Sequence, residues 1–125
     1  MELNIKDKVA IITGGSRGIG KACAIELAKE GVKICIASQN PINLKEASKE
    51  ISAITSNIIY VAADLSTEQG CQSVINATIE KFQNIDILIN NVGAANEEDV
   101  LTLQRTTLEK AANLKTFSYL SKIGR

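Results

Sequence analysis

The sequence of 125 residues contains no histidine and no tryptophan, one proline and three cysteines. Without histidine, a Ser-His-Asp triad and histidine-ligated metal sites are excluded. Cys23, Cys35 and Cys71 are odd in number and share no close spacing, so neither a disulfide framework nor a zinc site is indicated. We expect all three to lie in apolar surroundings and interpret them as small core residues.

The chain also has no net charge, because 14 Lys and Arg residues balance 14 Asp and Glu residues. A neutral chain has no general attraction to nucleic acid or anionic membranes, and 3% aromatic residues offer little for base stacking. No apolar stretch approaches the ~18 residues of a membrane span, and the first residues lack the layout of a secretion signal. We therefore expect a cytoplasmic protein whose main partner is neither nucleic acid nor a membrane.

The chain does have a regular alternation of apolar runs and amphipathic segments. Strands are predicted at residues 9–12, 32–37, 58–63 and 85–89. Helices are predicted between them, the second beginning at Pro41 and the third at a capping box, Ser66-Thr67-Glu68-Gln69. One face of the second helix is predicted to carry Leu44, Ala47, Ile51 and Ile54. This α/β pattern predicts a Rossmann-like, doubly wound parallel sheet of order 3-2-1-4, with a ligand crevice at the carboxyl ends of strands 1 and 4.

The turn between the first strand and the first helix is rich in glycine: Thr13-Gly14-Gly15-Ser16-Arg17-Gly18-Ile19-Gly20. A strand, a glycine turn and a helix form the arrangement that binds a pyrophosphate. Glycines remove Cβ atoms where a ligand meets the backbone, and the first N–H groups of the helix point at the anion. The spacing differs from the G-x-G-x-x-G dinucleotide fingerprint, so a purely structural turn is the alternative.

Three motifs together resemble the short-chain dehydrogenase/reductase family. The glycine turn matches that family's cofactor motif, and Asp64-Leu65 after the third strand matches its acidic residue beside the adenine. Asn90-Asn91-Val92-Gly93 matches its Asn-Asn-Ala-Gly motif, with Val92 in place of alanine. The resemblance is close over residues 6–93 and loose over residues 94–125. It implies an oxidoreductase that exchanges hydride between a nicotinamide dinucleotide and a carbonyl or alcohol substrate.

The resemblance also implies which residues contact the cofactor. Those along its phosphates and ribose would be Gly14, Ser16, Gly18, Ile19 and Gly20. Asp64 and Leu65 would frame the adenine, and Asn91, Val92 and Gly93 would lie at the adenosine ribose. The alternative role of Asn90 and Asn91 is to stabilise the end of the fourth strand, and in this family the two roles coexist.

The charge near the end of the second strand favours NADP(H) over NAD(H). An acidic residue there would bind a free ribose 2′-hydroxyl and repel a 2′-phosphate, but this strand ends in Ser38-Gln39-Asn40. Arg17 could pair with a phosphate through a two-pronged, charge-assisted bond. Gln39 is a departure, because NADP-dependent relatives often carry a second arginine there. The alternative for Arg17 is an ordinary solvated turn residue.

The family's catalytic set is a Tyr-x-x-x-Lys pair, a Ser on the preceding strand and an Asn on the helix before that. Asn113 lies about where the Asn belongs and is our candidate; the alternative is a polar residue on a solvated helix face. The Tyr-x-x-x-Lys pair is absent from this sequence, since Tyr119 and Lys122 are only three residues apart. The polypeptide alone is therefore expected to be inactive.

The family's domain is considerably longer than this chain. We therefore interpret residues 1–125 as a single, truncated dinucleotide-binding domain with a less regular helical tail at 94–125. Without a fifth strand, the fourth would be an apolar edge, and we expect self-association or completion by another chain. The alternative function is a catalytically silent module that binds a dinucleotide or a partner. The sequence leaves the substrate and the reaction direction open.

Overall fold

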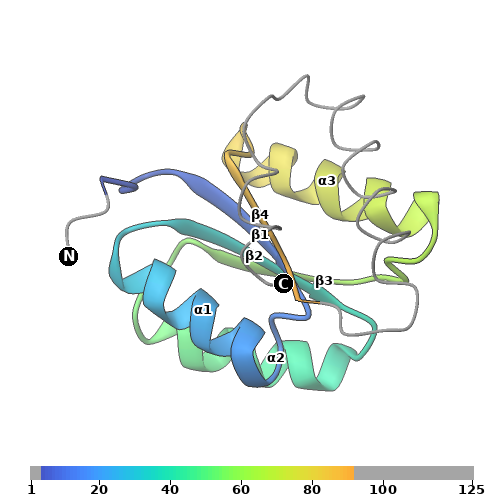
Figure 1. Ribbon diagram of the computed structural model, residues 1–125, viewed down its shortest axis with the longest axis horizontal. Coiled ribbons are helices and arrows are strands. Elements are labelled where there is room, and N and C mark those ends of the chain that lie inside the picture. Colours follow the sequence, from blue (N-terminus) through green and yellow to red (C-terminus); the bar gives the residue numbers. More distant parts are fainter. Residues whose placement is uncertain (1–3, 92–125) are drawn as a thin grey trace.

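The computed structural model describes residues 4–91, so the predicted tail at 94–125 lies outside the described residues. Strands and helices alternate strictly along the chain (Figure 1): β1 (Val9–Thr13), α1 (Gly18–Lys29), β2 (Lys33–Ser38), α2 (Pro41–Ser52), β3 (Ile58–Ala62), α3 (Glu68–Phe82) and β4 (Ile87–Asn90). All neighbouring strands are parallel, and the sheet order is β3-β2-β1-β4. The predicted Rossmann-like sheet order is confirmed.

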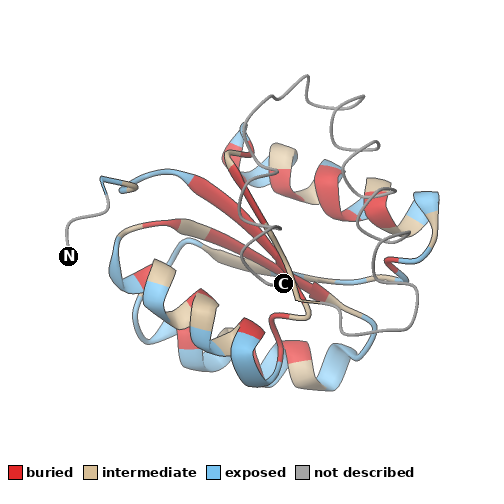
Figure 2. Ribbon diagram, in the orientation of Figure 1, coloured by how far each residue is buried: buried red, intermediate tan, exposed pale blue. Residues whose placement is uncertain are grey.

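The sheet is covered on both faces, α1 and α2 on one and α3 on the other (Figure 1). Successive residues of β1 alternate between two cores, which is why this strand is a continuous apolar run instead of an alternating one. Ala10 and Ile12 pack in the core under α1 and α2, and Ile11 packs in the core under α3. Figure 2 shows β1 buried along its whole length.

Small residues form the buried stripe of α1: Gly20, Ala24 and Ala28. Because these side chains are short, the backbone of α1 can lie close to the sheet. The buried stripe of α2 is larger and consists of Leu44, Ala47 and Ile51. The prediction for this helix was right for those residues and wrong for Ile54, because α2 ends at Ser52 and Ile54 is 39% exposed.

The start of α3 differs from the prediction by one residue. Thr67, instead of Ser66, is the N-cap, and its hydroxyl accepts a hydrogen bond from the Gly70 N–H at 2.9 Å. Ser66 is taken by Asp64, whose carboxylate accepts from both the Ser66 hydroxyl and the Ser66 N–H. The predicted capping box is therefore wrong, because the aspartate turn before the helix competes for the serine.

β4 is fixed to β1 at both ends. At the amino end, the Val9 N–H donates to the Asp86 carboxylate at 2.9 Å, and the Asp86 N–H donates to the Val9 carbonyl at 2.8 Å. At the carboxyl end, the Thr13 hydroxyl donates to the Asn90 side-chain oxygen at 2.6 Å, and the Asn91 N–H donates to the Thr13 carbonyl at 3.1 Å. These bonds hold the carboxyl ends of β1 and β4 side by side.

Cys35 and Cys71 are buried, as the sequence predicted, whereas Cys23 on α1 is only half-buried. Burial raises the pKa of the Cys35 thiol to about 11, although a hydrogen bond with Thr78 opposes the shift. Burial, together with the negative charges of Asp64 and Glu68, also raises the pKa of Cys71 to about 11. Both thiols therefore stay protonated near neutral pH and act as packing residues.

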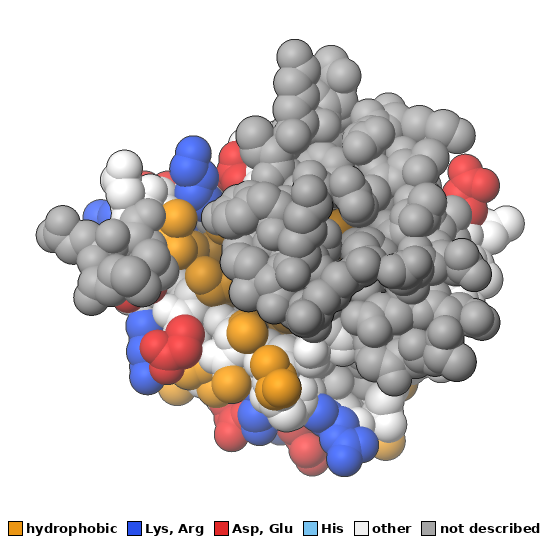
Figure 3. Space-filling view, in the orientation of Figure 1, with side chains coloured by type: hydrophobic (Ala, Val, Ile, Leu, Met, Phe, Trp, Pro, Cys, Tyr) orange, Lys and Arg blue, Asp and Glu red, His pale blue; other side chains and the backbone are white. Residues whose placement is uncertain are grey.

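Within residues 4–91, no helix combines the length and the apolar character that crossing a membrane requires. On the face shown in Figure 3, the Lys and Arg side chains along the lower rim lie among Asp and Glu side chains, and further basic side chains are visible at the left. The surface charge of that rim is therefore mixed in sign, in line with the neutral composition of the chain.

Candidate functional site

The carboxyl ends of all four strands lie at one edge of the sheet, and most of the predicted cofactor residues lie there. Gly14 follows β1, Ser38 ends β2, Asp64 follows β3 and Asn91 follows β4. The hydroxyl oxygens of Ser16 and Ser38 are 3.3 Å apart, so the glycine turn is tied to the end of β2. The structure thus brings together residues that are far apart in the sequence.

The glycine turn packs tightly against itself and against Asn91. A Cβ added to Gly14 would lie 2.7 Å from the Asn91 carbonyl oxygen, and Gly14 has a positive φ of 69°. A Cβ added to Gly20 would overlap the carbonyl oxygen of Gly14 and lie 2.9 Å from the side-chain nitrogen of Asn91. Side chains at these two positions are therefore excluded by the close approach of backbone to backbone.

The opposite side of the turn is open. A Cβ added to Gly18 would meet no atom of residues 4–91 within 4 Å, and the glycine is favoured there by its positive φ of 56°. Ile19, the next residue, is 74% exposed although it lies inside α1. The surface of the turn that faces away from the core thus offers free backbone and one exposed apolar side chain.

The amino terminus of α1 is not capped by a side chain. Its N-cap residue, Arg17, has an extended backbone and makes no capping hydrogen bond, and its first turn holds no acidic residue. The other two described helices are capped, α2 by Asn40 and α3 by Thr67. Among residues 4–91, no side chain therefore occupies the first N–H groups of α1, whose partial positive charge suits an anion. Phosphate oxygens are suited to this position.

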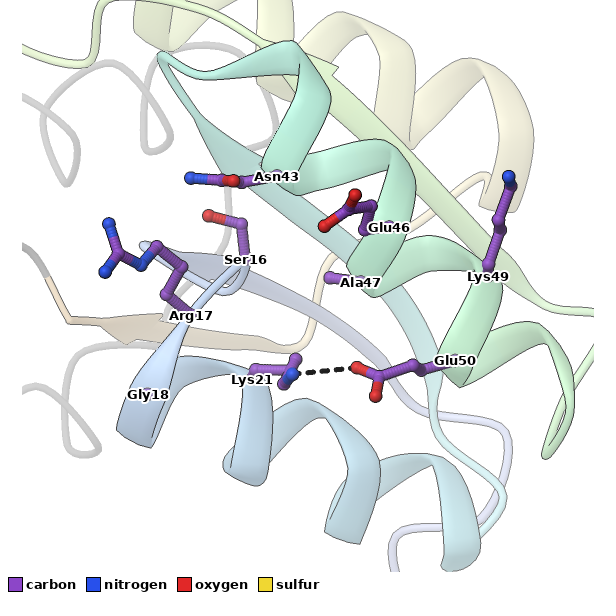
Figure 4. A pocket seen from close by; sticks show the side chains of 9 residues that line it. All are labelled: Ser16, Arg17, Gly18, Lys21, Asn43, Glu46, Ala47, Lys49 and Glu50. Carbon is purple, nitrogen blue, oxygen red and sulfur yellow. Dashed lines mark ion pairs between the residues drawn. The ribbon is translucent and has the colours of Figure 1, made fainter.

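A hollow of about 530 Å³ lies beside the turn, between α1 and α2 (Figure 4). It is lined by Ser16, Arg17, Gly18, Lys21, Asn43, Glu46, Ala47, Lys49 and Glu50. The first three are predicted cofactor residues, and the other predicted ones lie outside this hollow. The lining from α2 was missed at the sequence level, although Glu46 and Glu50 follow Asn43 at the spacing of one helix face.

Asp64 is exposed, and its carboxylate is held by its neighbours. Hydrogen bonds from the hydroxyl and the N–H of Ser66 hold the pKa of Asp64 below the usual aspartate range, and a bond with the Gln39 side chain acts in the same direction. Near neutral pH the group is therefore ionised and can only accept hydrogen bonds. An exocyclic amino group of a base is a suitable donor for it.

Leu65 contributes its side chain to the core. Its side chain is 7% exposed and packs with Val74 and Ile75 in the core under α3. Any contact between Leu65 and a ligand at the sheet edge would therefore use its backbone. Three further predicted residues, Val92, Gly93 and Asn113, lie outside the described residues.

Residues 8–123 match the sequence model of the short chain dehydrogenase family. The chain belongs to this family. Among its curated relatives, this chain is 35% identical over 116 residues to the uncharacterized oxidoreductase YhdF of Bacillus subtilis (strain 168). That match covers 91% of this chain and 40% of YhdF.

Two solved structures extend the comparison. L-sorbose reductase from Gluconobacter frateurii, solved with NADPH and L-sorbose, matches with a TM-score of 0.79 and 31% identity, over 90% of this chain and 49% of that one. A short-chain dehydrogenase/reductase from Burkholderia phymatum, solved with NAD, has a TM-score of 0.79 at 23% identity, over 88% of this chain and 46% of that one, and shows the fold alone. The chain thus spans about half the length of these proteins. Family membership does not favour the alternative of a silent, partner-binding module.

Proposed function

We propose that this chain binds NADP(H) as the cofactor-binding part of a short-chain oxidoreductase, which exchanges hydride with the carbonyl or alcohol carbon of a small substrate. The observation that carries the proposal is the uncapped amino terminus of α1, which follows an open glycine turn at the carboxyl edge of the sheet. Backbone N–H groups at such a position, with no partner in the described part of the chain, favour a diphosphate.

The residues at the sheet edge fit the parts of a dinucleotide. The first turn of α1, from Gly18 to Gly20, would hold the diphosphate, and the exposed Ile19 side chain would contact an apolar part of the ligand. The ionised Asp64 would accept a hydrogen bond from the adenine amino group. When bound, the nicotinamide ring supplies the hydride chemistry, and the protein's part is to bind and orient the cofactor.

The preference for NADP(H) rests on charge around the adenosine ribose. β2 ends without a carboxylate, and Ser38 with Ser16 presents two neutral hydroxyls instead. Arg17 is exposed, and within residues 4–91 it has no carboxylate at ion-pair distance. A free guanidinium favours a phosphate over a hydroxyl because it forms charge-assisted bonds in pairs. L-sorbose reductase, one of the relatives above, was solved with NADPH.

Binding and catalysis are separable in this chain. Its 125 residues contain no Tyr-x-x-x-Lys pair, so the group that would move a proton at the substrate oxygen is not among them. The proposal is that these residues bind the nicotinamide dinucleotide and do not by themselves oxidise it. Incubation of the chain with NADPH and carbonyl substrates should leave the absorbance of NADPH unchanged.

The test is a calorimetric titration of the wild-type chain and of Arg17→Ala with NADPH and with NADH. A charge-assisted hydrogen bond contributes about 1.5–3 kcal/mol, so the substitution should weaken NADPH binding about tenfold or more and NADH binding less than twofold. Lys29→Ala, which removes a cation from the exposed last turn of α1, is the matched control and should change neither. Equal losses for both nucleotides, or a wild-type chain that binds neither, would overturn the proposal.

A further inference from the structure

An ion pair between α1 and α2 closes one end of the hollow beside the glycine turn. The Nζ of Lys21 lies 2.8 Å from the Oε2 of Glu50, and the two side chains are 35% and 56% exposed. Lys21 is one helical turn after Arg17, so both cations belong to the same end of α1. Figure 4 shows the pair directed across the hollow, with Ser16 and Arg17 toward its other end.

The hollow is lined by charges of both signs. Three cations and two carboxylates line it: Arg17, Lys21, Lys49, Glu46 and Glu50. Of the described cations nearest the turn, Lys21 is engaged by Glu50, and Arg17 has no such partner within residues 4–91. A phosphate near Ser16 would therefore meet one unpaired cation on α1 and one that is already neutralised.

Resting on the proposed function, we infer that Glu50 limits the preference for NADP(H) over NAD(H) by holding Lys21 away from the ribose 2′-phosphate. Lysine is a point charge on a flexible four-carbon stem, so it can turn toward an anion when its partner is removed. A phosphomonoester carries about −1.5 to −2 charges at neutral pH, whereas a 2′-hydroxyl carries none. Release of Lys21 should thus strengthen binding of the phosphorylated nucleotide only.

The test uses the adenosine halves of the two cofactors as probes, 2′,5′-ADP and 5′-AMP, titrated into the full chain. Glu50→Gln should bind 2′,5′-ADP about three- to fivefold more tightly, the range expected for an exposed pair of charges. Its affinity for 5′-AMP should stay within twofold. The gain should shrink as salt rises, since exposed charges are screened over about 8 Å at 0.15 M.

Glu26→Gln is the matched control, because it removes one carboxylate and one ion pair from α1 at a distance from the hollow. Glu26 pairs with Lys29 at 3.4 Å and is 74% exposed. This control should leave the affinity for 2′,5′-ADP unchanged. If Glu50→Gln behaves like Glu26→Gln, or weakens 2′,5′-ADP binding, the inference is overturned.

A second variant separates the action of Lys21 from a general change in charge. In a Lys21→Gln background, Glu50→Gln should give less than half of the gain seen in the wild-type background. Equal gains in both backgrounds would contradict a role for Lys21. Circular dichroism melting curves of the wild type and the four variants establish that each is folded. A wild-type chain that binds neither probe would refute the proposed function itself, whereas a normal wild type with an unresponsive Glu50→Gln variant refutes this inference alone.

Discussion

α1 and α3 begin at the same edge of the same sheet, yet their first turns are built in opposite ways. α3 has a threonine cap, an acidic residue in its first turn and a preceding aspartate held by Ser66. α1 has an arginine at the N-cap position, no capping bond and no acid in its first turn. The chain therefore satisfies the amino terminus of α3 from within, whereas no side chain among residues 4–91 caps that of α1.

The fold repeats one unit, a strand followed by a helix. The difference indicates that the start of the helix can serve stability in one copy of this unit and binding in another. A capped helix end contributes about 1 kcal/mol to folding. An uncapped end forgoes that contribution and retains a partial positive charge of roughly half a unit for an anion. The close packing of Gly14 and Gly20 then fixes the position of the uncapped end relative to Asn91.

The largest effect on stability and binding is expected from Gly20→Ala, which disrupts the packing at the uncapped end of α1. The new Cβ would overlap the Gly14 carbonyl oxygen, so the turn must shift, and we expect a loss of about 3 kcal/mol in the free energy of unfolding. NADPH binding should become undetectable by calorimetry. Urea unfolding measures the first effect and titration the second.

Gly31→Ala, at the other end of α1, is the control for this change. Its positive φ of 85° makes alanine unfavourable by about 1–2 kcal/mol, and its nearest neighbour is the flexible side chain of Lys6. This variant should lose stability and keep its NADPH affinity. A Gly20→Ala chain that binds NADPH as tightly as the wild type would contradict the described turn.

Removing the cap of α3 and adding one to α1 should reverse the difference between the two helices. Thr67→Ala removes the cap of α3 and should lower the free energy of unfolding by about 1 kcal/mol, with no change in NADPH affinity. Arg17→Ser gives α1 a residue that can cap it, and should raise the free energy of unfolding by about 0.5 kcal/mol. The same change should weaken NADPH binding about tenfold, because the serine occupies an N–H group and the guanidinium is gone.

Urea unfolding and NADPH titration of both variants provide the measurement. The comparison fails if the ratio between the change in stability and the change in NADPH affinity is the same for Thr67→Ala and for Arg17→Ser. It also fails if the capped α1 retains the wild-type affinity for NADPH.

The smallest effect concerns Asp64. Its pKa is lowered in the folded chain, so its bonds with Ser66 stabilise the fold at neutral pH, and that stabilisation is lost as the pH falls through the folded pKa. A carbon-detected NMR titration of the carboxyl group should give a midpoint below that of an unfolded aspartate. Ser66→Ala should move the midpoint upward toward the ordinary value. An identical midpoint in both chains would contradict the hydrogen bonds described for this turn.

The sheet order and most element positions could be predicted from sequence, because buried parallel strands are continuous apolar runs such as Val9–Thr13. The direction of the Leu65 side chain could not be predicted, because the motif indicates that the residue lies at the sheet edge but not where its side chain packs. The cap of α3 was also missed, because Ser66 and Thr67 are both good capping residues and only the competing Asp64 decides between them. The hollow could not be predicted either, because it is formed where α1 packs against α2, and local sequence patterns carry no information on that packing.

The most direct test is an NMR titration of the uniformly ¹⁵N-labelled chain with NADPH, following backbone amides. The amides of Gly18, Ile19 and Gly20 should shift together and saturate with one dissociation constant, whereas the Gly70 amide, already bonded to Thr67, should not move. Unchanged amides in the first turn of α1, with or without shifts at α3, would contradict the account.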